Sequence, residues 1–370
     1  MKGDNIKLFC PERHYISHKK EYDDIFGKVL SGNRHVLGKY TEELESQIAK
    51  RTNRKYAVAV ITGSSALYIA FRAIRALNSM INPKVLSTNY TFAATPEAAL
   101  QNNCSLYVND IDRYAHMELE CSSEEIDILY PVNLFGNCMN YDKVEEFCKR
   151  NYIKYVIEDA AQSFGAYWNS RPSGSLGNIS CLSFDNKKNL ASFDQGGMLL
   201  TDDEDICIML RKMRQHGETT LNKRNGNGGI NGVMPELTSA NLLYRLENFF
   251  DDEQNRRRDI AKRYIEGLAS TPLILPEIDH KVIPVWQKFV IRTDNKHEFI
   301  DFLRCSGIES QPVYDYIISN CNFIEKDKVI CRGEENSTKW STSAVLLPMN
   351  PELTDDEIER VISVIHEYFK

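Results

Sequence analysis

Residues 183–190 of this 370-residue chain read SFDNKKNL. They follow an apolar run over 179–182, which is typical of a buried strand, and they lead into Gly196 and Gly197. A lysine at the end of a buried strand can hold an aldehyde cofactor as a Schiff base, because desolvation lowers the pKa of the amine and makes it nucleophilic. Most lysine pairs are solvated surface instead. Two further motifs favour a reactive lysine, which we expect to be Lys188.

The first of these motifs is a second expected strand over residues 154–158, which ends beside Asp159. An acid at the carboxyl end of a strand in a parallel sheet points into the crevice where such folds bind ligands. There the carboxylate of Asp159 can pair with a protonated pyridine nitrogen, the partner that lets pyridoxal phosphate (PLP) act as an electron sink. The alternative interpretation is that Asp159 caps the N-terminus of a helix.

The other motif follows the expected strand over residues 55–60, where Thr62, Gly63, Ser64 and Ser65 precede a run with helical spacing. Free N–H groups and the dipole at a helix N-terminus both favour a bound phosphate group. Serine is also an ordinary N-cap residue, so this motif is weak evidence when taken alone. Together the three motifs supply a phosphate cradle, a partner for a pyridinium nitrogen and a Schiff-base lysine.

Six motifs occur in order along nearly the whole chain: GSSAL at 63–67, YTFAAT at 90–95, DID at 110–112, PVNLFG at 131–136, EDAAQ at 158–162 and the lysine stretch. They resemble those of the DegT/DnrJ/EryC1/StrS family of sugar aminotransferases, which are PLP enzymes of the aspartate aminotransferase fold (fold type I). The resemblance implies an α/β, three-layer PLP-dependent transferase fold with a mostly parallel sheet and a smaller C-terminal α+β domain.

The resemblance also implies a role for each matched position. Lys188 would carry the Schiff base and move a proton between the substrate Cα and C4′ of the cofactor, while Asp159 would keep the pyridine nitrogen protonated. Gln162 resembles the family glutamine near the phenolic oxygen of the ring, and Phe92 resembles the aromatic residue stacked on the pyridine. The expected phosphate-binding positions are Ser64, Ser65 and Ser183.

A polar, glycine-rich stretch over residues 222–232 is typical of a surface loop. In the family, the corresponding loop reaches into the neighbouring subunit of a homodimer, where its asparagine helps bind the cofactor phosphate. Asn231 falls on that position, whereas the arginine that usually follows two residues later is Val233 here. The resemblance therefore implies a homodimer with its active site at the subunit interface and Asn231 as a cofactor-binding residue.

Several positions depart from the family pattern. Lys187 replaces the usual small residue before the Schiff-base lysine; this second cation could lower the pKa of the Lys188 amine, or contact solvent or a substrate phosphate. Asn133 and Val313 stand where histidines are common, and residues 194–197 read DQGG instead of GEGG or GDGG. These differences concern substrate contacts. The candidate substrate contacts near the motifs, each also typical of a structural or solvent-facing side chain, are Arg34, His35, Lys187 and His216.

Composition and charge limit the kinds of partner and compartment. The net charge is −7 with a pI near 5.7, and no basic stripe is present, which argues against a nucleic-acid binder. Ten cysteines at irregular spacings indicate reduced thiols of a cytoplasmic protein, and we expect no metal site. Residues 1–17 lack the apolar core of a signal peptide, and no run reaches the roughly 18 apolar residues of a membrane span.

The length exceeds that of a usual single core, so two domains are expected. We predict a large PLP-binding α/β domain over 1–250 and a small α+β domain over 251–370, with the N-terminal segment, about 1–30, packing on the small domain. In the small domain we expect a strand over 282–292, a helix over 296–305, and a capping box of Thr354 and Glu357. A helix is also expected to start with Thr41 as its N-cap. Other strands are expected over 84–89, 105–110, 126–132, 179–184 and 197–201.

A deoxysugar dehydratase of the family has histidine in place of the lysine, so the retention of Lys188 favours transamination. We therefore expect an aminotransferase that moves an amino group from L-glutamate to a keto group of a nucleotide-linked (dTDP-, UDP- or GDP-) keto-deoxysugar. The product would serve surface polysaccharide or glycoconjugate biosynthesis, such as O-antigen of lipopolysaccharide. The alternatives are a PLP-dependent dehydratase of the same family, an enzyme acting on a non-nucleotide ketone such as an inosose, and a cofactor-free binding or regulatory relative.

Overall fold

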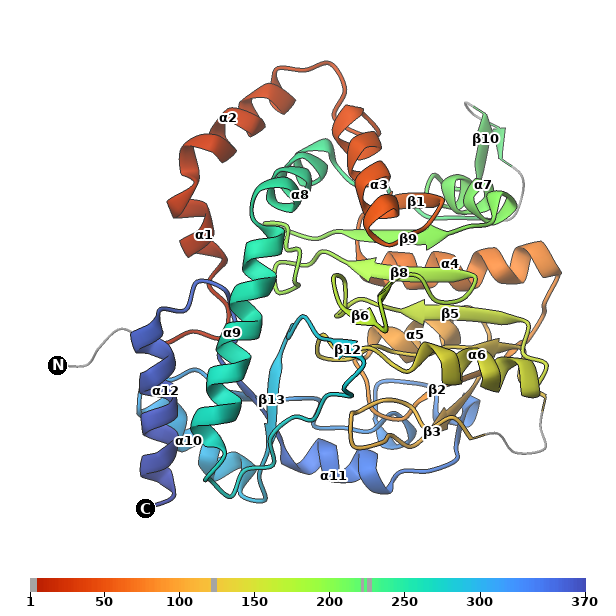
Figure 1. The fold of residues 1–370 in the computed structure, drawn as a ribbon. Coiled ribbons are helices and arrows are strands. Elements are labelled where there is room, and N and C mark those ends of the chain that lie inside the picture. Colours follow the sequence, from red (N-terminus) through yellow and green to blue (C-terminus); the bar gives the residue numbers. More distant parts are fainter. Residues whose placement is uncertain (1–4, 121–124, 221–222, 225–227) are drawn as a thin grey trace.

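The computed structural model describes residues 5–120, 125–220, 223–224 and 228–370 (Figure 1). A central sheet is built of strands in the order β1 (Tyr56–Val60), β9 (Gly197–Thr201), β8 (Ile179–Ser183), β5 (Tyr155–Asp159), β4 (Ile128–Leu129), β2 (Lys84–Thr88), β3 (Ser105–Asn109) and β15 (Val329–Cys331). Neighbouring strands are parallel except where β9 pairs with β1 and β8. The expectation of a mostly parallel α/β sheet is confirmed.

Helices cover both faces of this sheet, which explains why its strands are almost continuously apolar. In β1, Val58 and Val60 pack on the face covered by α4 (Gly63–Asn78), α5 (Ala94–Gln101) and α7 (Glu204–Met213). The alternate residues Ala57 and Ala59 pack on the opposite face, with α3 (Lys39–Arg51) and α8 (Glu236–Asn248). The last large helix on that face, α6 (Tyr141–Arg150), packs through Val144 and Phe147.

A second core surrounds a small antiparallel sheet in the order β13 (Phe289–Arg292), β16 (Ala344–Leu347) and β14 (Gln311–Pro312). It packs against α9 (Phe250–Leu268), α10 (Lys296–Cys305) and α12 (Asp355–Tyr368), and Figure 1 shows α10 and α12 far from β1 and β9. Ile6 belongs to this core and forms a β-bridge with Ile308, whereas α2 packs against α8, so the packing of the whole N-terminal segment on the small domain stays a prediction. The capping box of Thr354 and Glu357 is confirmed. The boundary at residue 250 stays a prediction, and β15, from the C-terminal part, joins the large sheet.

The remaining elements are short or lie at the edges. They are α1 (Pro11–Ser17), α2 (Lys19–Leu30), α11 (Glu335–Ser343), the two 3₁₀ turns Ile318–Asn320 and Lys326–Lys328, the ribbon β10 (Glu218–Thr220) with β11 (Lys223–Arg224), and a sheet of β12 (Val282–Ile283), β6 (Tyr167–Trp168) and β7 (Arg171–Pro172). Within the described ranges, no helix is both long and apolar enough to cross a membrane.

The prediction of one continuous strand over 282–292 was wrong, because the chain breaks between β12 and β13. Pro284 has no N–H to donate to a ladder, and Trp286 has a left-handed backbone with φ of 47°. The N–H of Val285 donates to the carbonyl of Gly136 at 2.9 Å instead of to a neighbouring strand. The break turns the following residues toward the lysine stretch.

The prediction of Thr41 as an N-cap was also wrong, because α3 begins at Lys39 after Gly38. The cap comes from a distant residue, the buried Glu236 at the start of α8. Its carboxylate accepts hydrogen bonds from the N–H groups of Gly38 at 2.8 Å and of Tyr40 and Thr41 at 3.1 Å each. The hydroxyl of Thr41 donates to the same carboxylate.

Candidate active site

Lys188 lies in a tight turn after β8. The carbonyl of Asp185 accepts from the N–H of Lys188 at 2.9 Å, and its carboxylate accepts from the N–H of Lys187 at 3.0 Å. Lys188 is half-buried, and desolvation, followed by the positive charge of Lys288, lowers its pKa to about 8. A substantial fraction of the amine is therefore neutral, and so nucleophilic, near pH 8.

The idea that Lys187 is the cation that lowers the pKa of Lys188 was wrong. Lys187 is exposed, and its Nζ lies 5.8 Å from the centroid of the Phe9 ring. The neighbouring cation that lowers the pKa of Lys188 is Lys288. Lys288 is not among the predicted site residues, because the predicted strand over 282–292 gives it no reason to lie near the lysine stretch. No local pattern marks it, since only the break before β13 brings it here.

Asp159 is the buried last residue of β5. Its Oδ2 accepts from Oγ1 of Thr95 at 2.9 Å, and its Oδ1 accepts from the N–H of Ala161 at 3.1 Å. Burial raises the pKa of Asp159, whereas these hydrogen bonds and the charge of Lys188 act in the opposite direction. Turns and not a helix follow β5, so the helix-cap alternative was wrong. The carboxylate is thus held where a cationic partner would stabilise its charge.

The residues of the expected phosphate cradle lie at and near the start of α4. The N-cap is Thr62, whose Oγ1 accepts from the N–H of Ser65 at 2.9 Å, so neither serine is needed as a cap. A Cβ at Gly63 would lie 2.6 Å from Cβ of Ser183, so the missing side chain lets β8 approach the helix end. Ser64 is exposed, while Ser65 and Ser183 are half-buried. The helix N-terminus and the three hydroxyls together suit a phosphate dianion.

Gln162 links two loops of the site. Its Oε1 accepts from the N–H of Phe135 at 3.0 Å, and its Nε2 donates to Oη of Tyr314 at 2.8 Å. Tyr314 has a left-handed backbone, with φ of 46°, and its ring centroid lies 6.2 Å from that of Phe92. Phe92 is 54% exposed, so its side chain is accessible to a ligand. Its stacking on a pyridine ring stays a prediction.

The loop with Asn231 contributes only part of its length to the described structure, because residues 222 and 225–227 lie outside the described ranges. Asn231 is exposed and forms a β-bridge with Gln215. The carbonyl of the next residue, Gly232, accepts from the N–H of Ile61 at 2.8 Å, just before the cradle. The other candidate contacts, which are all exposed, are Arg34, His35, Lys187 and His216.

Two departures from the family pattern have structural roles. Asn133 is buried; its Nδ2 donates to Oε1 of Glu158 at 2.7 Å and its Oδ1 accepts from the N–H of Met139 at 2.9 Å. Val313 is buried, and its carbonyl accepts from Oη of Tyr90 at 2.6 Å. Both residues therefore stabilise the loops behind the site.

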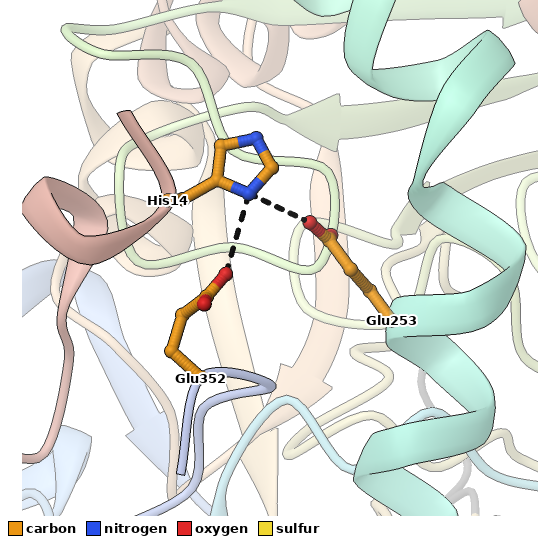
Figure 2. Close-up of side chains that lie close together, drawn as sticks. All are labelled: His14, Glu253 and Glu352. Carbon is orange, nitrogen blue, oxygen red and sulfur yellow. Dashed lines mark hydrogen bonds and ion pairs between the residues drawn. The ribbon is translucent and has the colours of Figure 1, made fainter. Parts of the chain in front are cut away.

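A separate cluster ties α1 to α9 (Figure 2). Nδ1 of His14 lies 3.4 Å from Oε1 of Glu253 and 3.3 Å from Oε1 of Glu352, and its Nε2 lies 2.8 Å from Oη of Tyr22. The ligand atoms of the three residues lie within 4.8 Å of one another, a spacing that could suit a metal ion. Arg245 pairs with Glu253 at 3.0 Å, and the hydrogen bond from His14 lowers the pKa of Glu352. The cluster is therefore stabilised by its own ion pairs, and the expectation of no metal site stays a prediction.

Comparisons with known proteins agree with this geometry. Residues 17–366 match the model of the DegT/DnrJ/EryC1/StrS aminotransferase family. One relative, the UDP-2-acetamido-2-deoxy-3-oxo-D-glucuronate aminotransferase of Pseudomonas aeruginosa, is 27% identical over 94% of this chain and 96% of its own length. Another, the dTDP-3-amino-3,6-dideoxy-alpha-D-galactopyranose transaminase of Aneurinibacillus thermoaerophilus, is 28% identical over 95% and 96%.

A solved structure, that of DesV from S. venezuelae in complex with a ketimine intermediate, has a TM-score of 0.92 and 25% identity and covers 99% of both chains. The fold, the cradle at α4, the buried Asp159 and the amine of low pKa at Lys188 all fit PLP. The chain therefore belongs to the DegT/DnrJ/EryC1/StrS aminotransferase family and is a PLP-dependent aminotransferase.

Proposed function

We propose that this protein transfers an amino group from L-glutamate to a keto group of a nucleotide-linked keto-deoxysugar, carried on dTDP, UDP or GDP. The two relatives are named for UDP- and dTDP-linked sugars and match almost the whole chain. The observation that carries the proposal is Lys188, retained at the end of β8 within electrostatic reach of Asp159. The family dehydratase has histidine at this position, so the lysine favours transamination.

When bound, PLP supplies an electron sink for charge that develops at carbon. The residues of this chain would do the rest. Asp159 would hold the proton on the pyridine nitrogen, and Lys188 would bind the aldehyde carbon. Once the donor displaces it, the Nζ of Lys188 would take up and return the proton. The groups that would anchor the phosphate are Ser64, Ser65 and Ser183.

We infer that the amino sugar product, still linked to its nucleotide, is used for surface polysaccharide or glycoconjugate synthesis, of which the O-antigen of lipopolysaccharide is one example. The proposed place of action is the cytoplasm. Nucleotide-linked sugars are activated donors, so an enzyme acting at this stage precedes glycosyl transfer.

We infer a homodimer from an apolar surface formed by α2, α8 and the loop before β9. Leu30 is 62% and Leu237 36% exposed, and with Phe193 they line a hollow that also includes Asn241. Asn241, at the base of this hollow, is buried, and neither of its amide atoms has a hydrogen-bond partner in the described chain. Sedimentation of the protein and of Leu237→Glu tests this inference; a wild-type monomer would refute it.

Complementation tests whether Asn231 acts across the interface. We expect Asn231→Asp to weaken PLP binding, because its carboxylate repels the phosphate. Mixed with Lys188→Ala, it should regain activity, since one site of each heterodimer then has both native residues. Absence of rescue, with exchange of subunits confirmed by sedimentation, would mean that Asn231 acts within its own subunit.

The proposed reaction is tested by the visible spectrum and by product mass. Purified protein with added PLP should show a visible absorption band at about 420 nm, and glutamate should bleach this band. Keto-sugars on each nucleotide should then gain an amino group. A mass change equal to loss of water would favour the dehydratase, and a protein that stays colourless with PLP would favour a cofactor-free relative. Conversion of an inosose alone would exclude the nucleotide-linked substrate.

A further inference from the structure

We propose that Lys288 binds a substrate carboxylate, either that of the amino donor or one carried by the sugar, and so selects acidic substrates. This inference rests on the proposed aminotransferase function. It is carried by three observations: where the segment before β13 is held, what surrounds the Lys288 ammonium group, and which charges lie nearby.

The segment that carries Lys288 is fixed to two loops of the site. Nε2 of Gln287 donates to the carbonyl of Lys187 at 2.7 Å, and the N–H of Lys288 donates to the carbonyl of Phe135 at 3.4 Å. Gly136 has φ of 88°, and a Cβ there would lie 2.5 Å from the N of Gln287, so the two backbones are in direct contact. Lys288 is therefore positioned by backbone contacts, and its long side chain starts from a defined point.

The ammonium group lies on the Gln162 side of the site. Nζ of Lys288 donates to Oη of Tyr314 at 3.3 Å, and the same oxygen accepts from Nε2 of Gln162 at 2.8 Å. The Lys288 Nζ also lies 4.9 Å from the centroid of the Tyr314 ring and 5.8 Å from that of Phe135. In PLP the phenolic oxygen and the phosphate flank the aldehyde carbon on opposite sides. With Gln162 near the phenolic oxygen, Lys288 lies away from the phosphate and is free to serve the substrate.

The charges around the Lys288 ammonium group favour the binding of an anion next to it. Among the described residues, no carboxylate lies within ion-pair distance of Lys288, whereas the buried Lys296 is paired with Asp315. Burial, followed by the charge of Lys187, lowers the pKa of Lys288 to about 8, although the negative charge of Asp185, beyond ion-pair distance, acts in the opposite direction. A half-buried ammonium group beside two further lysines is stabilised strongly by a charged hydrogen-bond acceptor. A substrate carboxylate would supply one.

A carboxylate fits this position better than the diphosphate of a nucleotide sugar. The α-carboxylate of glutamate is bonded directly to Cα, the carbon that reacts. It therefore lies close enough to the reacting atoms to contact a cation beside Lys188. A uronate carboxylate is likewise close to a ring carbon that is aminated at C4. The diphosphate is attached at C1, which is farther than C5 from a keto group at C4 and as far as C5 from one at C3. The two carboxylate sources share one chemistry and are separated by experiment.

The experiment uses the PLP-loaded protein, Lys288→Gln, Lys288→Arg and the matched control Lys281→Gln, which removes an exposed lysine from the same segment. Calorimetry measures the binding of glutarate, an inert dicarboxylate. Single-turnover spectra first measure how glutamate bleaches the visible band. They then measure how the band returns when a neutral nucleotide-linked keto-deoxysugar or a keto-uronate is added. Melting temperature and the visible band report whether each variant folds.

In Lys288→Gln we expect one of two quantities to rise by roughly tenfold to a hundredfold. It is either the Kd of glutarate together with the glutamate concentration at half-saturation, or the keto-uronate concentration at half-saturation. Lys288→Arg should keep most of the affinity, and Lys281→Gln should match the wild type. Losses confined to glutamate and glutarate assign the donor; a loss confined to the keto-uronate assigns the sugar. Unchanged binding of every carboxylate overturns the proposal, and so does an equal loss with the neutral sugar. If the wild type forms no band or is not bleached by glutamate, the proposed function fails instead.

Discussion

The side of the site that would hold PLP and the side that carries Lys288 are built in different ways. The first, which we call the cofactor wall, consists of residues at the ends of β5 and β8 and at the start of α4: Ser64, Ser65, Asp159, Ser183 and Lys188. The second, the substrate wall, comes from loops and consists of Gln287, Lys288 and Tyr314. Trp286, next to it, and Tyr314 have left-handed backbones.

This difference separates chemistry from specificity. A parallel sheet places the ends of its strands at one edge, so a short motif after each strand reaches the same crevice. The substrate wall depends on contacts between segments far apart in the chain, such as Gln287 with Lys187 and Gln162 with Tyr314. We therefore expect changes in the cofactor wall to abolish the reaction and changes in the substrate wall to alter which substrate is used.

The largest effect is expected from Lys188→Ala in the cofactor wall. Without the amine, neither the Schiff base nor the proton transfer can occur, and turnover should fall by a factor on the order of 10⁴ or more. The visible band that depends on this Schiff base should be absent, and adding glutamate should cause no bleaching. The matched control is the exposed neighbour, Lys187→Ala, in which the visible band should still form and glutamate should still bleach it. If bleaching survives in Lys188→Ala and is lost in Lys187→Ala, the reactive lysine is Lys187 and not Lys188.

Asp159→Asn should have the next largest effect. The amide keeps the shape of the side chain but not the negative charge that would hold a proton on the pyridine nitrogen. We expect kcat to fall by roughly 10²–10⁴-fold with the band still formed. Asp24→Asn, an exposed residue on α2, is the control for a lost negative charge. Near-normal turnover in Asp159→Asn would show that the cofactor wall does not depend on this carboxylate.

The pH dependence tests how the two walls interact. Only the neutral amine of Lys188 is nucleophilic, and its pKa is lowered to about 8, mainly by desolvation and then by Lys288. The rate at which cofactor-free protein combines with PLP should therefore rise with pH and level off above about 8. In Lys288→Gln the midpoint should move upward, because a positive charge is removed. A midpoint near the ordinary lysine value of 10.5 in the wild type would contradict this account.

The smallest effect on the reaction is expected outside both walls, at Glu236. Its carboxylate accepts hydrogen bonds from three N–H groups at the start of α3, so Glu236→Gln should destabilise the fold by about 1–3 kcal/mol. The melting temperature should fall by several degrees, with little change in KM for glutamate. The control is Glu247→Gln, which changes an exposed glutamate on the same helix, α8. A large loss of turnover without a loss of stability would connect this region to the site.

Local sequence predicted where the residues of the cofactor wall lie, and their roles stay predictions. Asp159 and Ser183 end apolar strands, and Lys188, Ser64 and Ser65 follow such strands, which are recognised from a few consecutive residues. The expected α/β sheet and the capping box of Thr354 were confirmed for the same reason. The cross-subunit role of Asn231 stays a prediction, since it concerns a contact between chains.

What the sequence by itself determined is the order of strands and helices and the short motifs at their ends, because backbone hydrogen bonding and apolar periodicity are local properties. Only the tertiary structure decided that the charge of Lys288, and not that of Lys187, lowers the pKa of Lys188, and that Glu236 caps α3. Both results depend on segments far apart in the chain. Their meeting is set by packing and by single left-handed residues such as Trp286, which no local pattern predicts.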